Sequence, residues 1–258
     1  MNNRCILITG ATGAIGGALA RAYAHKHAGR DTRLLLQGRD QQKLEQIRLE
    51  CTRAGAEVKV FAFDLRDRAS LAEWLTAIIK VETVDLAIVN AGVNTHVHAD
   101  GTAENWAEVE SLIETNVRAA FAIVNAILPA MRQRRSGQIA LISSLAAYHG
   151  LPMTPSYCAS KAALKAYGEG LRSLLAAEGV MVNVVMPGYV SSPMCDDMPG
   201  PKPFLLAPEK AAKIIKRGLE KNCARISFPF PLNAGTWFLA VLPAAISQRL
   251  VKLFGYGL

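Results

Sequence analysis

A short apolar run, a glycine-rich turn and a helical pattern follow one another at the start of this chain. Residues 5–8 have the composition of a buried strand, and Thr-Gly-Ala-Thr-Gly-Ala-Ile-Gly occupies positions 9–16. Glycines let a backbone turn tightly and approach a pyrophosphate, whose charge the free N–H groups at a helix start can satisfy. A purely structural turn is the alternative. The order of these segments predicts the first strand and helix of an α/β fold.

Apolar runs alternate with helical stretches along the rest of the chain. Strands are expected at 33–37, 58–63, 85–89, 138–143 and 181–186, and helices at 41–54, 69–80, 104–132, 155–177 and 208–221. This alternation predicts a Rossmann-type, doubly wound parallel sheet with helices on both faces. The chain has 258 residues, 51% of them hydrophobic, so we expect residues 1–258 to form a single domain.

Ligands of such a sheet bind beyond the carboxyl ends of its strands, where this chain places glycines and polar residues. The strands are followed, in order, by residues 10–16, by Gly38 and Arg39, by Asp64 and Leu65, by Asn90, Ala91 and Gly92, by Ser144, and by Pro187 and Gly188. We therefore expect one binding site along this edge of the sheet.

The expected helix 155–177 has start and stop signals. Thr154 can cap it, Pro155 suits its first position, and Gly179 lies just past its end. A helix that starts there places the next polar residues in its first turns, close to its positive end.

Tyr157 and Lys161 share one side of this helix, and with Ser144 they could meet a single carbonyl group. Because side chains four positions apart are neighbours, we expect the ammonium and the helix N-terminus to lower the phenol pKa from about 10. Such a tyrosine would serve as a general acid and base. A tyrosine and a lysine four positions apart are also common in ordinary helices. The catalytic interpretation therefore depends on the presence of the glycine turn in the same chain.

Over residues 4–195 these motifs together resemble the short-chain dehydrogenase/reductase family, in its single-domain branch. The resemblance implies hydride transfer between a nicotinamide and a carbonyl or alcohol group. It implies that Tyr157 is the general acid and base and that Lys161 assists it and binds the nicotinamide ribose. Ser144, thirteen residues before the tyrosine, would polarise the carbonyl, whereas Ser143 would be structural. Asn116 would anchor a water molecule in the proton relay.

The resemblance also implies the cofactor contacts. Asp64 would meet the adenine amino group, and Val190 and Ser192 would hold the nicotinamide carboxamide. The complete set consists of Gly10, Thr12, Gly13, Ala14, Ile15, Gly16, Arg39, Asp64, Leu65, Asn90, Ala91, Gly92, Tyr157, Lys161, Pro187, Gly188, Val190 and Ser192.

The glycine turn departs from the pattern of the single-domain branch, Thr-Gly-x-x-x-Gly-x-Gly. Ala14 stands at the sixth position, and Gly13 precedes it, as in a longer branch that includes nucleotide-sugar enzymes. About seventy residues follow the last expected strand, too few for that branch's substrate domain. Two alternatives stay open: a nucleotide-sugar modifying enzyme that recycles NAD(P), and a non-catalytic protein that senses a dinucleotide.

The end of the second strand bears on the choice of cofactor. An enzyme that prefers NAD usually has an acidic residue where Gly38 stands. Arg39 beside it could bind the 2′-phosphate of NADP, while Asp40 is better placed to cap the next helix. We therefore expect NADP(H) to be preferred over NAD(H).

Composition excludes several other functions. The five cysteines form no Cys-x-x-Cys pair, so we expect free thiols and no metal site. The net charge is +8, but the basic residues are scattered, so we expect no nucleic-acid partner. The N-terminus has no secretory signal pattern, which favours a cytoplasmic protein.

The C-terminal quarter lacks a recognised motif. We expect residues 193–207 to form an apolar lid for a substrate with a largely nonpolar face, and residues 225–258 to form an apolar extension. That extension is expected to pack over the pocket or a neighbouring subunit. The alternative is membrane-surface attachment, with Trp237 and Phe238 in lipid. The apolar helices 104–132 and 155–177 favour a homodimer or homotetramer.

Overall fold

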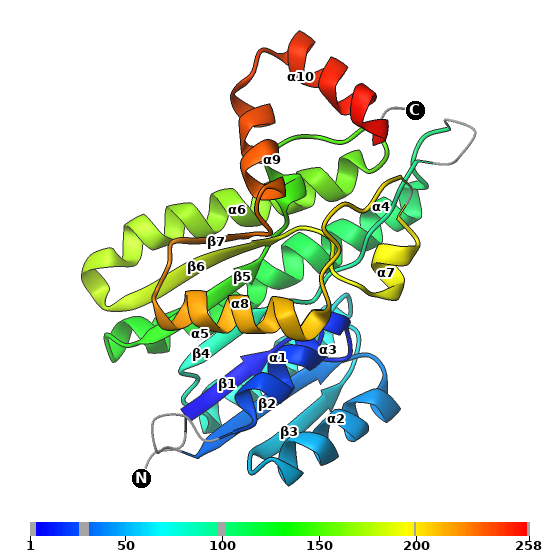
Figure 1. The fold of residues 1–258 in the computed structure, drawn as a ribbon. Coiled ribbons are helices and arrows are strands. Elements are labelled where there is room, and N and C mark those ends of the chain that lie inside the picture. The colour runs from blue at the N-terminus through cyan, green and yellow to red at the C-terminus, as the bar shows by residue number, and fades with distance from the viewer. Residues whose placement is uncertain (1–3, 26–30, 98–101, 199, 257–258) are drawn as a thin grey trace.

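Seven parallel strands form one sheet, in the order β3-β2-β1-β4-β5-β6-β7 (Figure 1). The structure is a computed structural model and describes residues 4–25, 31–97, 102–198 and 200–256. The strands are β1 (Arg4–Ile8), β2 (Thr32–Gly38), β3 (Glu57–Ala62), β4 (Leu86–Val89), β5 (Gly137–Ile142), β6 (Val180–Pro187) and β7 (Arg225–Phe228). The strand order reverses beside β1, between β2 and β4, which opens a crevice at the carboxyl edge.

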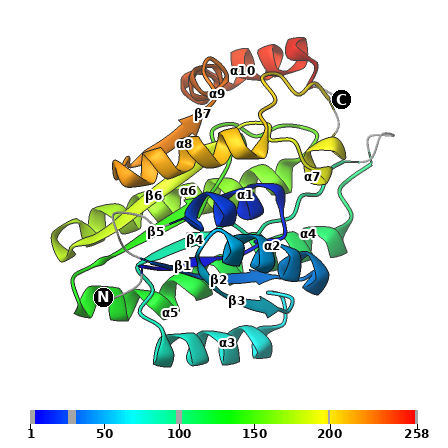
Figure 2. The same cartoon turned by 60° about the horizontal axis from the view of Figure 1, so that its bottom comes forward.

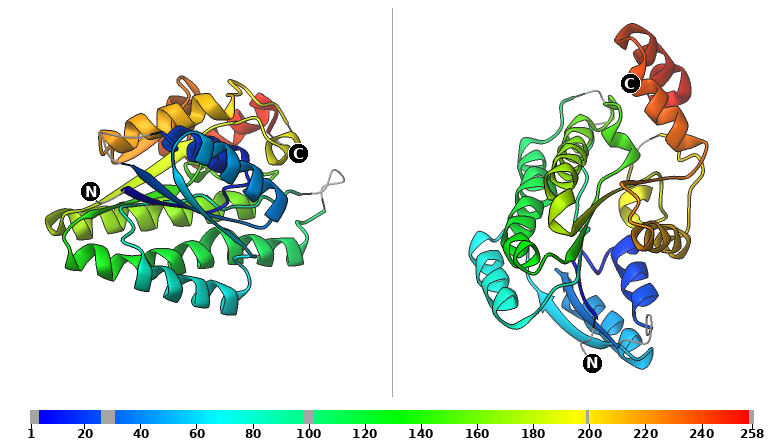
Figure 3. Two further views of the ribbon diagram at one scale, coloured as in Figure 1. Left: turned by 90° about the horizontal axis from the view of Figure 1, so that it is seen from below. Right: turned by 90° about the vertical axis from the view of Figure 1, so that its left-hand side faces the viewer.

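Helices cover both faces of the sheet, as Figure 2 and the left view of Figure 3 show. One face holds α1 (Ala14–Tyr23), α2 (Gln41–Arg53) and α8 (Pro208–Glu220). The other holds α3 (Arg68–Val81), α5 (Ala120–Gln133) and α6 (Pro155–Leu175). The predicted doubly wound α/β fold is therefore confirmed.

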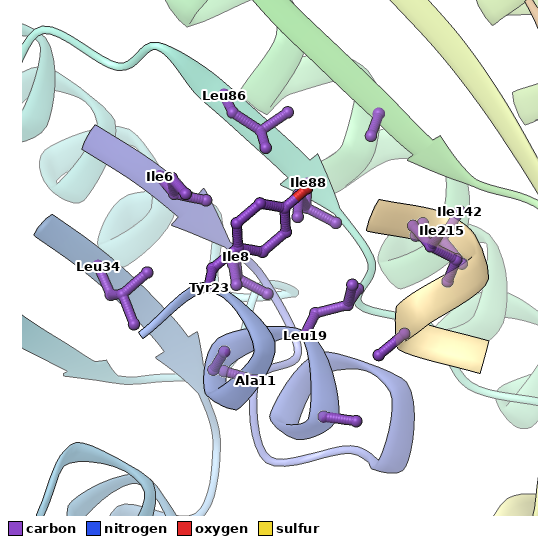
Figure 4. Packing of buried hydrophobic residues seen from close by; sticks show 14 of the residues in the cluster. Ile6, Ile8, Ala11, Leu19, Tyr23, Leu34, Leu86, Ile88, Ile142 and Ile215 are labelled. Atoms are coloured by element: carbon purple, nitrogen blue, oxygen red, sulfur yellow. The ribbon is translucent and has the colours of Figure 1, made fainter. Parts of the chain in front are cut away.

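Side chains of β1 alternate between the two cores. Ile6 and Ile8 pack with Leu19 and Tyr23 of α1 on one face (Figure 4). Leu7 belongs to the core under α3 and α5 on the other face. This alternation follows from the period of two along a strand, and burial on both sides explains why the run is continuously apolar.

The expected helix 104–132 is divided into three segments: α4 (Trp106–Ile113), the π-helical η1 (Glu114–Ala119) and α5. Together they form a 28-residue helical stretch, Trp106–Gln133, with the length and hydropathy of a membrane span. Its buried residues, Ile123 and Val124 among them, pack against the sheet in the way of a core helix. The predicted pairing of subunits through this helix and α6 stays a prediction.

Strand β7 differs from the sequence expectation, which places residues 225–228 in the C-terminal extension. The strand has four residues and pairs with β6, in a register that sets Arg225 beside Val184. After it come α9 (Leu232–Val241), α10 (Ala244–Val251) and the short segment η4 (Lys252–Tyr256). These helices project from the body of the molecule, as the right view of Figure 3 shows.

Candidate functional site

A cavity of about 1390 Å³ lies at the carboxyl edge of the sheet. Its lining contains Ser144, Tyr157 and Lys161 and every predicted cofactor residue except Gly16. Neither Gly16 nor Asn116 belongs to the lining, and both are buried. The structure thus brings residues from six strand ends and α6 into one site.

The glycine turn is closely packed against the loop after β4. Gly10 has a φ of +63°, and a β-carbon there would lie 2.7 Å from the Cα atom of Ala91. The Asn90 side-chain amide donates hydrogen bonds to the carbonyl oxygens of Thr9 (3.0 Å) and Gly10 (3.1 Å). The Thr9 hydroxyl accepts the backbone N–H groups of Asn90 and Ala91. These contacts fix the path of the turn against the loop after β4.

Helix α1 begins at Ala14, and the N-cap position before it is Gly13, which has no side chain to accept a capping hydrogen bond. Both line the cavity, so the helix N-terminus faces it with backbone N–H groups rather than with a capping side chain. A helix start of this kind suits an anionic group. Ala14, which departs from the family pattern, is therefore one of the residues that line the cavity.

Gln37, which belongs to none of the sequence motifs, supports the same turn. This residue is buried near the end of β2, and its amide nitrogen donates to the carbonyl oxygen of Phe63 over 2.8 Å. Its amide oxygen accepts the N–H of Gly10 at 3.4 Å. A polar residue directly after the apolar run at 34–36 was the signal that could have identified it.

Tyr157 lies in the first turn of α6, facing the loop that begins with Ser144. Burial raises the pKa of the Tyr157 phenol to about 12, and a hydrogen bond with Ser144 opposes that rise. The predicted lowering of this pKa is therefore wrong for the structure. The Lys161 ammonium lies 5.6 Å from the centre of the phenol ring and donates a 3.0 Å hydrogen bond to the carbonyl oxygen of Ile142 instead.

Lys161 is almost fully buried, and this burial lowers the pKa of its ammonium to about 8. Gly92 leaves room for it, because a β-carbon at that position would lie 3.2 Å from Nζ. The hydroxyl of Ser143, the residue after β5, donates to the backbone carbonyl oxygen of Lys161 over 2.7 Å. Lys161 is thus held between β5 and the loop after β4.

Asn116 lies in the π-helical turn η1, behind the cavity. Its amide oxygen accepts the N–H of Val93 (2.8 Å), and its amide nitrogen donates to the carbonyl oxygen of Val93 (2.9 Å) and the hydroxyl of Ser160 (3.0 Å). Asn116 therefore ties the loop after β4 to α6. The predicted role in a water relay stays a prediction.

The start of α6 differs in one detail from the sequence expectation. Thr154 precedes the helix and Pro155 begins it, but the Thr154 side chain does not cap it. Its hydroxyl instead contacts the carbonyl oxygen of Thr95 (2.7 Å) and the amide oxygen of Asn94 (2.9 Å). A carboxylate oxygen of Glu104 accepts the backbone N–H of Ser156 and takes the place of the expected cap.

The buried charge of Lys161 predicts a pH-dependent stability. Because the folded-state pKa is about 8 and the ordinary value is 10.5, the unfolded chain binds more protons between these values, and stability rises with pH there. We expect the free energy of unfolding of the native protein, relative to Lys161→Met, to rise by about 2–3 kcal/mol between pH 7 and pH 10. Denaturant unfolding of both proteins tests this, and a constant difference would contradict it. The range ends near pH 10 because Lys161 of the unfolded chain also loses its proton near pH 10.5, and the difference then stops growing.

Arg39 is exposed and lines the cavity, whereas the acidic residues near it are already engaged. Asp40 caps α2, as predicted, by accepting the N–H of Lys43 at 3.0 Å. Asp64 is paired with Arg66 at 2.6 Å, and this hydrogen-bonded arginine lowers the pKa of the Asp64 carboxyl. Gly38 has little space, because a β-carbon would lie 2.8 Å from the Thr12 methyl group.

Much of the remaining lining is apolar and comes from the loop after β5, from Tyr189, from the predicted lid and from the C-terminal helices. These lining residues are Leu145, His149, Leu151, Tyr189, Pro193, Met194, Cys195, Met198, Pro201, Pro203, Phe204, Pro231, Leu232, Gly235, Thr236, Phe238, Leu239, Leu250, Val251, Phe254 and Tyr256. Position 199 of the lid lies outside the described residues.

A hydrogen-bonded link joins the predicted lid to the segment η4. The Tyr256 hydroxyl donates to the carbonyl oxygen of Pro201 (2.9 Å) and accepts the hydroxyl of Tyr189 (3.1 Å). Only the folded chain brings these residues together, so their sequence spacing carries no signal of this contact. All five cysteines are free, and the described residues contain no group of three or more His, Cys, Asp or Glu side chains that could hold a metal ion.

Comparison with known proteins agrees with these features. The family profile described as short chain dehydrogenase matches residues 4–200. An uncharacterized oxidoreductase of Myxococcus xanthus is 34% identical over 244 residues, 94% of either chain. Ketoacyl reductase HetN of Nostoc sp. is 34% identical over 194 residues, which cover 74% of this chain and 65% of that protein. A short-chain dehydrogenase from Sphingobium yanoikuyae, solved with NADPH, has a TM-score of 0.79 and 22% identity, covering 97% of this chain and 95% of that one.

Proposed function

Because this chain belongs to the short-chain dehydrogenase family of oxidoreductases, we propose that it transfers a hydride between NADP(H) and a carbonyl or alcohol substrate with a largely nonpolar face. One observation carries the proposal. The glycine turn and the side chains of Ser144, Tyr157 and Lys161 line a single cavity, whose other end is apolar. A nonpolar ketone at that end would reach both the proton donor and the cofactor.

The residues of the cavity fit a nicotinamide dinucleotide. The turn has no space for β-carbons at Gly10 and Gly16, and the N-terminus of α1 faces the cavity without a capping side chain. The turn would hold the pyrophosphate, and Lys161 would hold the nicotinamide ribose. The bound nicotinamide would supply or accept the hydride.

The phenol of Tyr157 is the proton donor in this proposal. Its raised pKa keeps it protonated at neutral pH, which supports carbonyl reduction, because reduction needs a proton for the carbonyl oxygen. Ser144 would donate a hydrogen bond to that same oxygen and orient it. Below a pH of about 8 Lys161 carries its proton, so its charge favours the tyrosinate that remains after proton transfer.

Cofactor preference is predicted to depend on Arg39. A charge-assisted contact contributes about 1.5–3 kcal/mol, so Arg39→Ala should lower the ratio of kcat/KM with NADPH to that with NADH by roughly 10–100-fold. Arg53→Ala, on the exposed end of α2 and outside the cavity lining, is the matched control and should leave the ratio unchanged. A native enzyme with higher kcat/KM for NADH would contradict the prediction. Gly38→Asp is a poor test because its β-carbon meets Thr12.

The substrate class can be tested by following NADPH absorbance with aldehydes, bulky ketones and 3-oxoacyl thioesters. The similarity to a ketoacyl reductase motivates the last group. We expect apolar ketones to be reduced faster than small polar ones, because the cavity end beyond Tyr157 is apolar. A preparation that retains NAD and converts nucleotide sugars without net cofactor turnover would contradict the proposed function.

A further inference from the structure

The C-terminal helices project as a hairpin that lines part of the cavity and also carries exposed apolar side chains. This C-terminal hairpin comprises residues 230–256, with α9, α10 and η4 (Figures 1 and 3). Its first helix, α9, contains Leu232, Thr236 and Leu239, which are partly buried and line the cavity. Trp237 and Val241 are exposed and lie outside the cavity lining. Residues four apart share one side of a helix, so α9 has an inner and an outer side.

Large apolar side chains are concentrated on this hairpin. The described part of the chain exposes seventeen large apolar residues, and seven of them lie between positions 230 and 254. These are Phe230, Trp237, Phe238, Val241, Ile246, Leu253 and Phe254, each at least 48% exposed. Phe238 and Phe254 also line the cavity, so the other five are exposed outside its lining. Large apolar side chains exposed together on a projecting element are typical of an interaction site.

The charge of the segment is entirely basic. No Asp or Glu follows Glu220 in the sequence, whereas Lys221, Arg225, Arg249 and Lys252 do follow it. Arg249 and Lys252 are exposed on α10 and η4, next to the apolar side chains. An apolar surface edged by cations is complementary to a lipid surface with anionic headgroups.

We propose that the outer side of the C-terminal hairpin docks on an anionic lipid surface. Trp237 and Leu253 enter the boundary between headgroups and acyl chains, while Arg249 and Lys252 meet lipid phosphates. Helix α9 has ten residues, about 15 Å, so it lies along the surface and does not cross a bilayer core of about 30 Å. A second copy fits less well, because two such hairpins would bring their cations together with no acidic residue on either. The proposal does not depend on the redox activity.

Co-sedimentation of the intact protein with vesicles tests this proposal. With phosphatidylcholine vesicles that contain about 30% phosphatidylglycerol, most of the protein should sediment, and less should sediment with pure phosphatidylcholine. The double variant Trp237→Glu, Leu253→Glu should lower the partition coefficient by about 10-fold or more, because charges replace inserted apolar groups. Arg249→Gln with Lys252→Gln should lower binding to the anionic vesicles on the order of 10-fold.

Trp106→Glu is the matched control, since Trp106 is 71% exposed and lies on α4, outside the hairpin. It should sediment like the native protein. Far-UV circular dichroism establishes that each variant is folded. Intact protein that stays in the supernatant with anionic vesicles overturns the proposal, as does equal loss of binding in the control. A second outcome would also overturn the proposal. If the native protein does not bind vesicles, and the hairpin variants have a lower molar mass than the native protein in light scattering without lipid, the apolar surface contacts a second copy of the chain.

Tryptophan fluorescence gives an independent measurement of insertion. The chain has three tryptophans, and Trp106→Phe leaves Trp74 and Trp237. Trp74 is buried, so quenching of this variant by brominated lipid reports on Trp237. We expect clear quenching with anionic vesicles. Sedimentation without quenching would show that the protein is held by charge alone, and the proposed insertion would be wrong.

Discussion

Tyr157→Phe is expected to reduce turnover by about 10²–10⁴-fold while the fold and the cofactor affinity are kept. The substitution removes one hydroxyl from the cavity and leaves the ring that packs in the first turn of α6. That hydroxyl is protonated at neutral pH because burial raises its pKa, so its loss removes the proton donor to the carbonyl oxygen. Steady-state kcat with a ketone that the native enzyme reduces is the measurement.

Tyr167→Phe provides the control for this variant. Tyr167 lies on the same helix, stacks on Phe121 and accepts a hydrogen bond from Asn125, but it does not line the cavity. Removing its hydroxyl should leave kcat within about two-fold, because no proton passes through it. Wild-type kcat in Tyr157→Phe would show that the assignment of the proton donor is wrong.

Gly16→Ala is expected to lower the affinity for the nicotinamide dinucleotide by about 100-fold or to prevent stable folding. A β-carbon at position 16 would lie 2.3 Å from the carbonyl oxygen of Gly10 and 2.8 Å from the side-chain nitrogen of Asn90. Both are fixed by hydrogen bonds, so the turn must move away from its place at the start of α1. Overpacking of this kind costs about 1–3 kcal/mol or more. Denaturant unfolding and cofactor titration measure the two effects separately.

Gly13→Ala is the matched substitution three residues earlier. Its β-carbon would meet a single atom, the carbonyl oxygen of Gly10, at 3.3 Å, and Gly13 does not have a positive φ. We expect a loss of stability below about 1 kcal/mol, with cofactor affinity within about 10-fold of the native value. Equal effects of the two alanines would contradict the role given to the packing of Gly16.

Several parts of the fold could be predicted because their signals are local. The buried strands were recognisable as apolar runs, and helix α2 begins where Asp40 can cap it. The strand, glycine turn and helix at the N-terminus identified the edge where the cavity lies. Strand β7 could not be predicted from the sequence. It has only four residues, begins with an exposed arginine, and forms by pairing with β6.

Some features of the cavity could likewise be predicted from the sequence, and others could not. Residues 10–16 and the pair Tyr157 and Lys161 were predictable, since each depends on neighbours within one turn or one helix. The raised pKa of Tyr157 was not predictable, because burial by distant segments opposes the effect expected from helical spacing. The sequence also could not predict that α9 has one side on the cavity and one side exposed, since only the folded chain shows which of its apolar residues line the cavity.

Local sequence patterns specify most strands and helices of the sheet domain, and they place a glycine turn after the first strand and Tyr157 and Lys161 on one helix. These features are set by side-chain periodicity, capping and backbone freedom, which act over a few residues. Only the three-dimensional contacts specify that Lys161 donates to the carbonyl oxygen of Ile142, that Tyr256 contacts Pro201, and that large apolar side chains of the C-terminal hairpin stay exposed. Burial and desolvation depend on contacts between residues far apart in the chain, and a linear pattern does not fix those contacts.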